Sequence, residues 1–246
     1  MKISGFTFVR NAVKFDYPVR EAILSILPLC DEFIVSIGNC DDGTEDLIKS
    51  IIDPRIKIYH SVWDDSLRHG GRVLAVETDK AYEKVSPDAD WVFYVQGDEV
   101  LHEKYLPIVK DALQQYHHDT NVDGLLFKYI HFYGSYDYIG EAMRWYRKEI
   151  RIIRRRPDIF SYRDAQGFRK LPNKKLNVKE IDAYIYHYGW VRPPKAMYIK
   201  QHSFGQLYNG STASIPENDF DYSEIDALSK FTGTHPSVMI DRMAAW

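Results

Sequence analysis

The feature of this sequence that most restricts its fold is a regular alternation of strand and helix patterns over the first 115 residues. Strands are expected at 3–9, 32–37, 55–60 and 91–95, and helices at 18–27, 44–52 and 72–84. Residues 91–95 show no polar alternation, which is typical of a strand covered by helices on both faces. Such an order builds right-handed βαβ units, so the sequence predicts an α/β fold with a mostly parallel sheet flanked by helices.

The pattern changes after residue 120. A further helix is expected at 99–117, followed by mixed strands with long polar loops, and residues 181–190 alternate as a strand. From residue 194 the pattern is helical, with a Gly/Ser/Asn-rich loop at 209–214. We therefore expect three parts, at 1–120, at 121–193 and at 194–246, of which the last is a C-terminal helical extension.

Composition excludes several classes of protein. The 246 residues carry a formal net charge of −3, and the sequence pI is about 6.3, which argues against a nucleic-acid partner. The two cysteines form no CxxC motif and fit a reducing compartment. We find neither a signal peptide nor an apolar run long enough to span a membrane, so a cytoplasmic, soluble protein is expected.

Polar side chains follow the predicted strands, where the carboxyl ends of a parallel sheet open on one edge and bind ligands. Arg10 and Asn11 follow the first strand, a 39–42 turn follows the second, and Gln96-Gly97-Asp98-Glu99 follows the fourth. Neither GxGxxG nor GxxxxGK[ST] is present, so an acidic turn would bind a diphosphate through Mn²⁺ or Mg²⁺. The alternative is that Asp98 only caps the following helix.

Two segments resemble a known family. "DEFIVSIGNCDDGTEDLI" (31–48) and "DWVFYVQGDEVLH" (90–102) resemble family-2 glycosyltransferases of the GT-A fold, with an acidic turn closing in DGT and a DxD motif after the fourth strand. The resemblance implies a Rossmann-like GT-A fold, a nucleotide-sugar donor, a divalent ion on Asp98, a nucleotide-sugar-binding half at 1–120 and an acceptor-binding, catalytic half at 121–193. The sequence departs from the family at Gln96, which stands for the first acid of DxD, and at Ile37-Gly38, where the family has an acid that contacts the nucleotide base. The implied nucleotide-sugar contacts are Arg10, Asn39, Asp41, Arg68, Gln96 and Asp98.

The strand "AYIYHYGW" holds the other metal candidate. Its period of two places His187 on the same face as Ala183 and Ile185, opposite three tyrosines. That pattern fits a core histidine. The resemblance instead implies that this strand passes near the metal, so His187 would ligate the ion together with Asp98.

An inverting glycosyl transfer needs a carboxylate that takes the proton of the acceptor hydroxyl. Asp164 resembles the family's base, and it lies in a loop with Gly167; the alternative is that it only orders its own turn. Glu149 is surrounded by cations, which would lower its pKa and make it a poor base. Asp137 lies in a tyrosine-rich turn that suits acceptor binding. The expected acceptor-binding residues are Asp137, Tyr162 and Arg169.

The basic stretch, defined here as the cations at 144, 147, 148, 151 and 154–156, has two interpretations. It is either a solvated face or a surface that attracts a diphosphate or a lipid-linked acceptor at an anionic membrane. Our leading hypothesis is a metal-dependent, inverting hexosyltransferase that acts on a glycan or lipid-linked glycan in polysaccharide biosynthesis. The alternatives are a nucleotidyltransferase and a non-catalytic carbohydrate- or nucleotide-binding protein.

Overall fold

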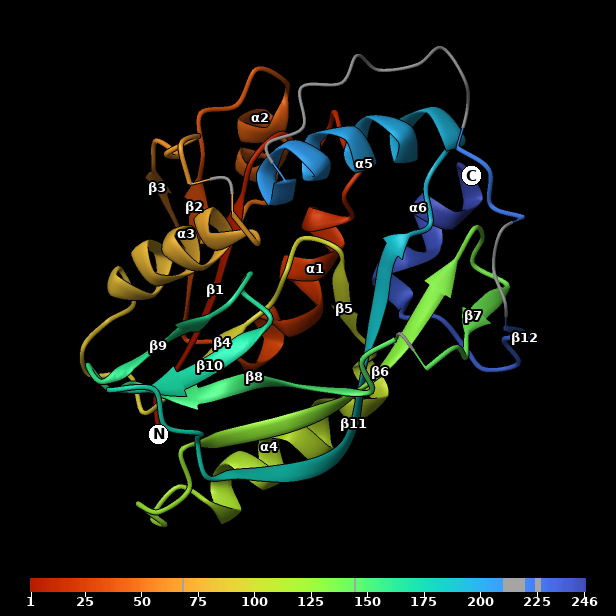
Figure 1. Ribbon diagram of the computed structural model, residues 1–246. Coiled ribbons are helices and arrows are strands. Elements are labelled where there is room, and N and C mark those ends of the chain that lie inside the picture. Colours follow the sequence, from red (N-terminus) through yellow and green to blue (C-terminus); the bar gives the residue numbers. More distant parts are fainter. Residues whose placement is uncertain (68, 144, 210–219, 224–226) are drawn as a thin grey trace.

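The computed structural model describes the chain except residues 68, 144, 210–219 and 224–226. Within these described residues the main sheet has ten strands in the order β12-β7-β6-β8-β4-β1-β2-β3, and β11 pairs with both β6 and β5. Parallel pairing joins β1 with β2 and β4, β2 with β3, and β6 with β11, while the other pairs are antiparallel. The predicted α/β class, a mixed sheet flanked by helices, is confirmed (Figure 1).

The elements have the following bounds. The strands are β1 Ile3–Val9, β2 Glu32–Ile37, β3 Ile56–His60, β4 Trp91–Tyr94, β5 Glu99–Leu101, β6 Gly124–Tyr133, β7 Tyr138–Gly140, β8 Lys148–Arg154, β9 Ile159–Tyr162, β10 Gly167–Lys170, β11 Val178–Trp190 and β12 Leu228–Lys230. The α-helices are α1 Val19–Ile26, α2 Thr44–Lys49, α3 Arg72–Glu83, α4 Leu106–Gln115, α5 Pro194–Asn209 and α6 Ile240–Ala244. The main sheet thus takes strands from all three predicted parts, because the C-terminal extension contributes β12 beside its helices.

The predicted helix at 99–117 is wrong in its first half. Val100 and Leu101 are fully buried in β5, which pairs antiparallel with β11. A 3-10 turn follows at Glu103–Tyr105, and α4 begins only at Leu106, with a proline in its first turn that suits a helix start. Asp98 therefore does not cap this helix, which removes the alternative role proposed for it.

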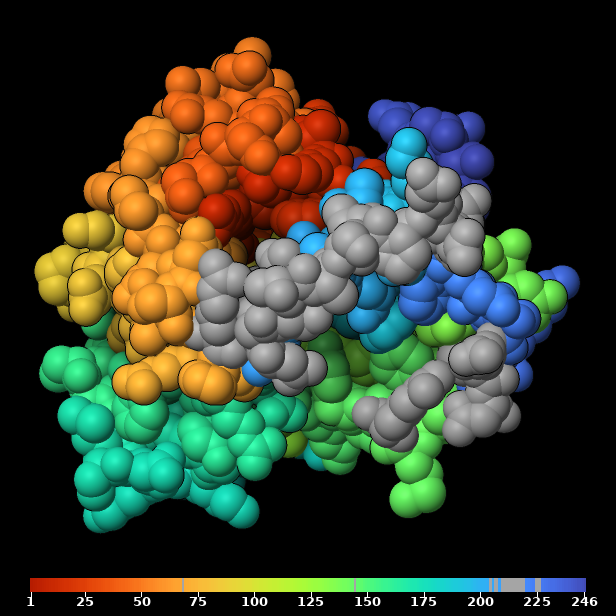
Figure 2. Space-filling model, turned by 45° about the horizontal axis from the view of Figure 1, so that its top comes forward, coloured from red at the N-terminus to blue at the C-terminus, as the bar shows by residue number. Residues whose placement is uncertain are grey.

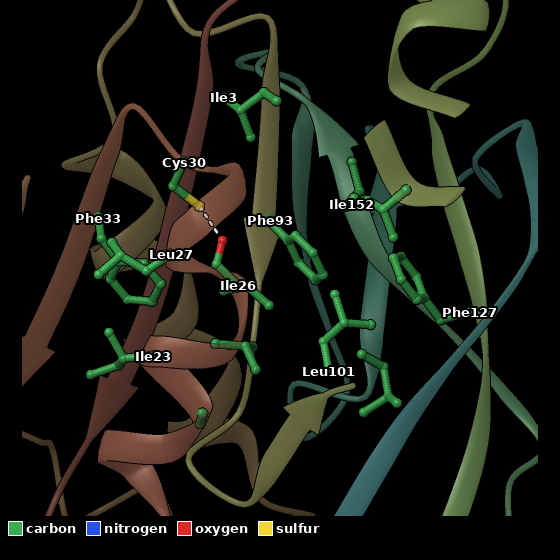
Figure 3. Packing of buried hydrophobic residues seen from close by; sticks show 14 of the residues in the cluster. Ile3, Ile23, Ile26, Leu27, Cys30, Phe33, Phe93, Leu101, Phe127 and Ile152 are labelled. Atoms are coloured by element: carbon green, nitrogen blue, oxygen red, sulfur yellow. Dashed lines mark hydrogen bonds between the residues drawn. The ribbon is translucent and has the colours of Figure 1, made fainter. Parts of the chain in front are cut away.

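Successive side chains of the central strands point to opposite faces of the sheet, and each face has its own hydrophobic core. Phe33 of β2 and Phe93 of β4 pack with α1, whereas Ile34 and Val92, their neighbours in sequence, pack on the opposite face with α3. Figure 3 shows the first core, in which Phe127 and Ile152 of β6 and β8 continue the packing from Phe93. Burial on both faces explains the continuous apolar runs of the central strands.

Helix α5 lies beyond the carboxyl ends of β1 and β2 (Figure 1). The blue residues of α5 border the red and orange N-terminal residues in the space-filling view (Figure 2). In the described parts of the chain, no helix is both long and apolar enough to cross a bilayer.

Glu32 of β2 is buried and joins three neighbouring segments. Its carboxylate accepts hydrogen bonds from the Ser4 hydroxyl at 2.7 Å, the Lys57 ammonium at 2.7 Å and the Ser86 backbone N–H at 2.9 Å. Burial raises the pKa of Glu32, but these hydrogen bonds outweigh burial and lower the pKa from 4.5 to about 2. The ionised carboxylate is therefore part of the folded structure.

We expect Glu32→Gln to lower the free energy of unfolding at pH 7 by about 1–3 kcal/mol, because a buried charged acceptor is lost. The folded-state pKa lies below the unfolded value of 4.5, so the stabilisation is complete above pH 4.5 and is lost as pH falls through about 2. Urea unfolding at pH 7 and pH 3 measures the difference. Glu45→Gln, which removes a surface ion pair with the exposed Lys49, should change the free energy of unfolding by less than about 0.5 kcal/mol. A wild-type advantage over Glu32→Gln that does not shrink at low pH would contradict the assignment.

Candidate functional site

A cleft of about 970 Å³ opens at the carboxyl ends of the parallel strands. Arg10 and Asn11 after β1, Asp41 after β2 and Gln96–Asp98 after β4 line it, as the sequence pattern predicts for this edge of the sheet. The second half of the chain closes the cleft. Its lining residues include Asp164, His187, Lys200 and Tyr208.

The end of the cleft near β1 and β2 is built around Trp63. The guanidinium of Arg10 lies 5.5 Å from the Trp63 ring centre and pairs with Asp65 at 2.8 Å. A Cβ atom at Gly38 would lie 2.5 Å from Trp63 Nε1, so an acid cannot occupy this position while the indole lies there. Trp63 Nε1 is buried and has no hydrogen-bond partner among the residues described. Glycine at position 38 thus leaves space for the Trp63 indole, which lines this end of the cleft.

Of the other predicted nucleotide contacts, Asp41 lines the cleft and Asn39 does not. Asp41 lines the cleft and pairs with Lys14 at 2.9 Å. Asn39 is exposed, and its side-chain oxygen lies 3.4 Å from the Trp63 backbone N–H, outside the cleft lining. Arg68 lies outside the described residues.

A buried ion pair fixes the turn after β4. The two carboxylate oxygens of Glu99 accept from Nε and Nη2 of Arg151 at 2.8 and 2.7 Å, and both side chains are almost fully buried. Glu99 also accepts from the Gln96 backbone N–H and the Tyr129 hydroxyl. Arg151 Nη1 donates to the Gln166 carbonyl at 2.9 Å, so the pair joins the Gln96–Asp98 turn to the loop that carries the predicted base.

The cations of the basic stretch differ in exposure: Arg147 and Lys148 are exposed, Arg151 and Arg154 are buried, and Arg144 lies outside the described residues. The interpretation as a solvated face is therefore wrong for Arg151 and Arg154. Arg151 is 1% exposed, and Arg154 stacks on the buried Trp91 ring with 3.7 Å between the guanidinium carbon and the ring centre. Arg156 pairs with the buried Asp123 at 2.6 Å. Arg151, Arg154 and Arg156 thus pair with carboxylates and carbonyls of the fold, and attraction of a diphosphate or a lipid-linked acceptor stays a prediction for the exposed Arg147 and Lys148.

The structure brings Asp98 and His187 together, although they are far apart in the sequence. His187 Nε2 lies 3.7 Å from Asp98 Oδ1, and a Cβ atom at Gly189 would lie 2.5 Å from His187 Nε2 and 2.7 Å from Asp98 Oδ2. Only glycine permits this approach. Burial lowers the pKa of His187 to about 4, so the ring is neutral at pH 7. The Nδ1 atom of His187 is hydrogen bonded to His131 Nδ1 at 2.9 Å.

A buried lysine completes this group. Lys200 Nζ lies 3.3 Å from Asp98 Oδ2 and donates to the Gly189 carbonyl at 2.8 Å. Burial raises the pKa of Asp98, but the nearby positive charges, Lys200 foremost, outweigh it and lower the pKa to about 2. Burial lowers the pKa of Lys200 itself to about 7, and the charge of Arg192 adds to this effect.

The donor set around Asp98 does not fit a divalent ion well. The described residues contain no group of three or more His, Cys, Asp or Glu side chains that could hold a metal. Gln96 supplies no carboxylate and donates its amide to the Ala165 carbonyl at 3.2 Å, while Glu99 is taken up by Arg151. An ammonium group already lies against the remaining carboxylate. The metal role of Asp98 and His187 remains a prediction.

Asp164 lies in the turn between β9 and β10 and lines the cleft. Its neighbours Arg163 and Ala165 both have positive φ angles, 58° and 65°, which is an unfavourable backbone for residues with a Cβ atom. Tyr208 of α5 donates its hydroxyl to Asp164 Oδ2 at 2.5 Å. The backbone of this turn is therefore strained on both sides of Asp164, and the turn places the Asp164 carboxylate at the cleft.

The other predicted acceptor residues and the second base candidate lie elsewhere. Asp137 is exposed in the turn between β6 and β7, and Tyr162 stacks with Arg169 at 4.4 Å; none of the three lines the cleft. The expected low pKa of Glu149 is wrong. Burial raises its pKa and outweighs the opposing effects of the Arg151 charge and the Gln166 hydrogen bond.

Sequence reasoning missed Lys200 and Tyr208, which α5 brings to the cleft. They are eight residues apart, a spacing that places both on roughly one face of a helix. That spacing is the only sequence signal for them, since the apolar pattern of α5 is weak. Both contact acids from distant segments.

No family model matches the chain, and no curated protein matches it. The chain is similar in structure to S. aureus TarS, with a TM-score of 0.46 and 16% identity over 83% of this chain and 39% of that chain. It is also similar to S. aureus TarS 1–349 in complex with UDP, with a TM-score of 0.47 and 15% identity over 87% of this chain and 67% of that chain. Glucosyl-3-phosphoglycerate synthase from Mycobacterium tuberculosis, in complex with Mn²⁺, UDP and phosphoglyceric acid, has a TM-score of 0.35 and 19% identity over 53% of this chain and 43% of that chain.

We expect Arg151→Met to lower the free energy of unfolding by about 3–5 kcal/mol, because it leaves the Glu99 carboxylate buried without its partner. The double variant Glu99→Gln with Arg151→Met should lose less than the sum of the single changes. Denaturant unfolding at pH 7 measures both. Lys148→Met on the same strand, whose partner Glu180 is exposed, is the matched control and should cost under about 0.5 kcal/mol. Equal losses for Arg151→Met and Lys148→Met would contradict this role of the pair.

Proposed function

We propose that this chain is a glycosyltransferase that moves a hexosyl group from a nucleoside-diphosphate donor to a hydroxyl of a glycan acceptor, with inversion. The observation that carries the proposal is the arrangement of Asp98 and Asp164, two acids from distant segments that line one cleft at the carboxyl edge of the parallel strands. A reaction of this kind needs a diphosphate-binding end and a base in the same cleft.

The Trp63 end of the cleft suits the base of a nucleotide. An indole ring and the guanidinium of Arg10 offer flat surfaces for stacking, and Asp65 and Asp41 offer acceptors nearby. The diphosphate would then lie toward Gln96–Asp98, and the sugar beyond it toward Asp164. Gln96 contacts the Ala165 carbonyl next to Asp164, so the turn after β4 and the β9–β10 turn are neighbours in the cleft.

In the proposed reaction Asp164 takes the proton of the acceptor hydroxyl as that oxygen attacks the anomeric carbon. The bond between the anomeric carbon and the diphosphate oxygen breaks, and the nucleoside diphosphate leaves. The strained turn and the hydrogen bond from Tyr208 keep the Asp164 carboxylate aimed into the cleft. A preorganised base of this kind costs no rearrangement during the chemical step.

A panel of nucleotide sugars tests the proposal directly. We expect one nucleoside-diphosphate sugar to raise the free energy of unfolding, by about 2.7 kcal/mol at 100 times its dissociation constant, in thermal unfolding scans. Trp63→Ala should remove the shift because it removes the stacking wall. Tyr138→Ala, which removes an exposed aromatic ring, is the control and should keep the shift. A complete panel without any shift for the wild-type protein would refute a nucleotide-sugar donor.

We expect Asp164→Asn to lower turnover by about 10²-fold or more while donor affinity changes little, because an amide keeps the shape of the base but cannot take a proton. Release of the nucleoside diphosphate in the presence of a glycan acceptor measures turnover, and calorimetry measures affinity. Asp137→Asn, in the exposed turn away from the cleft, is the matched control and should be fully active. Near wild-type turnover in Asp164→Asn would remove this residue from the role of base.

A further inference from the structure

We propose that Lys200 of α5 binds the diphosphate of the donor directly, in place of a divalent ion, so that the donor binds without metal. The inference rests on the proposed function and names the group that neutralises the diphosphate. The resemblance to family-2 enzymes predicts the opposite, a metal on Asp98.

The position of Lys200 supports this role. Lys200 is 7% exposed and lines the cleft, and its ammonium contacts Asp98 Oδ2 at 3.3 Å and the Gly189 carbonyl at 2.8 Å. Asp98 is the acid on which a family-type site would carry its ion. Lys200 therefore presents a positive charge beside the carboxylate that would hold such an ion.

The balance of charge around Asp98 points to an anionic ligand. The fully buried Arg192 adds a second positive charge; its Nη1 donates to the Phe15 carbonyl at 2.8 Å and its guanidinium lies over the Tyr17 ring. Its Nε and Nη2 atoms form no hydrogen bond with the part of the chain that the structure describes. Among the described residues, Asp98 thus lies near two buried cations, Lys200 and Arg192, and burying positive charge is costly unless anionic groups offset it. A diphosphate would supply the missing negative charge.

The same balance disfavours a metal. A divalent ion between Asp98 and His187 would add two positive charges close to the Lys200 ammonium, and repulsion is strong where water is largely excluded. Gln96, in place of an acid, brings no negative charge to offset them. The loss of the first acid of the motif and the presence of Lys200 are therefore consistent with each other.

Calorimetric titration with UDP, GDP and ADP, in EDTA and in MnCl₂, tests the proposal without any acceptor. We expect the preferred nucleotide to bind the wild-type protein in EDTA with an affinity within about threefold of that in MnCl₂. Lys200→Met should weaken binding in EDTA by about tenfold or more, because the buried cation that pairs with the phosphates is lost. Lys200→Arg should recover much of the affinity, since it restores the charge. Lys195→Met, an exposed lysine in the first turn of the same helix, is the matched control and should bind as the wild type does.

Three results would overturn the inference. Wild-type binding that requires Mn²⁺ would overturn it without any variant, and so would unchanged or tighter binding by a folded Lys200→Met protein. These two results leave the proposed function intact, because a nucleotide still binds. Absence of binding by all three nucleotides, in EDTA and in MnCl₂ alike, would refute the nucleotide donor and the role of Lys200 together.

Discussion

The buried pair of Glu99 and Arg151 is the interaction on which the rest of the cleft depends. Its bidentate geometry satisfies both charges, which is the condition under which a buried ion pair is tolerated. Through Glu99 it fixes the backbone of Gln96, and through the Gln166 carbonyl it fixes the loop of Asp164. The two acids of the cleft therefore receive their relative position from a pair that performs no chemistry itself.

The pair also explains how charges are divided at this edge of the sheet. Glu99 and Asp98 are adjacent in sequence, but Asp98 lies in the turn after β4, whereas Glu99 is the first residue of β5. Glu99 turns into the sheet and meets Arg151 from β8, whereas Asp98 turns into the cleft and meets Lys200 from α5. Glu99 therefore stabilises the fold, and Asp98 lines the cleft.

The sequence predicts those parts of the structure that local patterns encode. The bounds of β1 and β2 are confirmed, and polar residues after the strands of the parallel sheet do gather in one cleft, because topology alone brings those strand ends together. The parts that depend on distant partners were wrong or absent. The segment after Asp98 has helix-forming residues, yet Val100 and Leu101 form a strand because β11 offers an open edge. The basic stretch has the composition of a solvated face, yet its buried partners Glu99, Asp123 and the Trp91 ring come from other strands and loops. Pairing across the chain overrides local propensity in both cases.

Helix α5 links the two ends of the cleft. Lys200 contacts Asp98 and Tyr208 contacts Asp164, and the eight residues between them span about 12 Å of helix. Because a helix is stiff over two turns, a displacement that separates Lys200 from Asp98 also moves Tyr208 relative to Asp164. Gly71, in the left-handed region with φ of 68°, lets the loop before α3 pack against both Asp164 and the Tyr208 ring, since a Cβ atom there would lie 2.7 Å from Asp164 Cβ and 2.8 Å from the ring. Asp98 and Asp164 are thus both contacted by α5. The distance between these two acids therefore depends on the geometry of this helix as well as on the sheet beneath them.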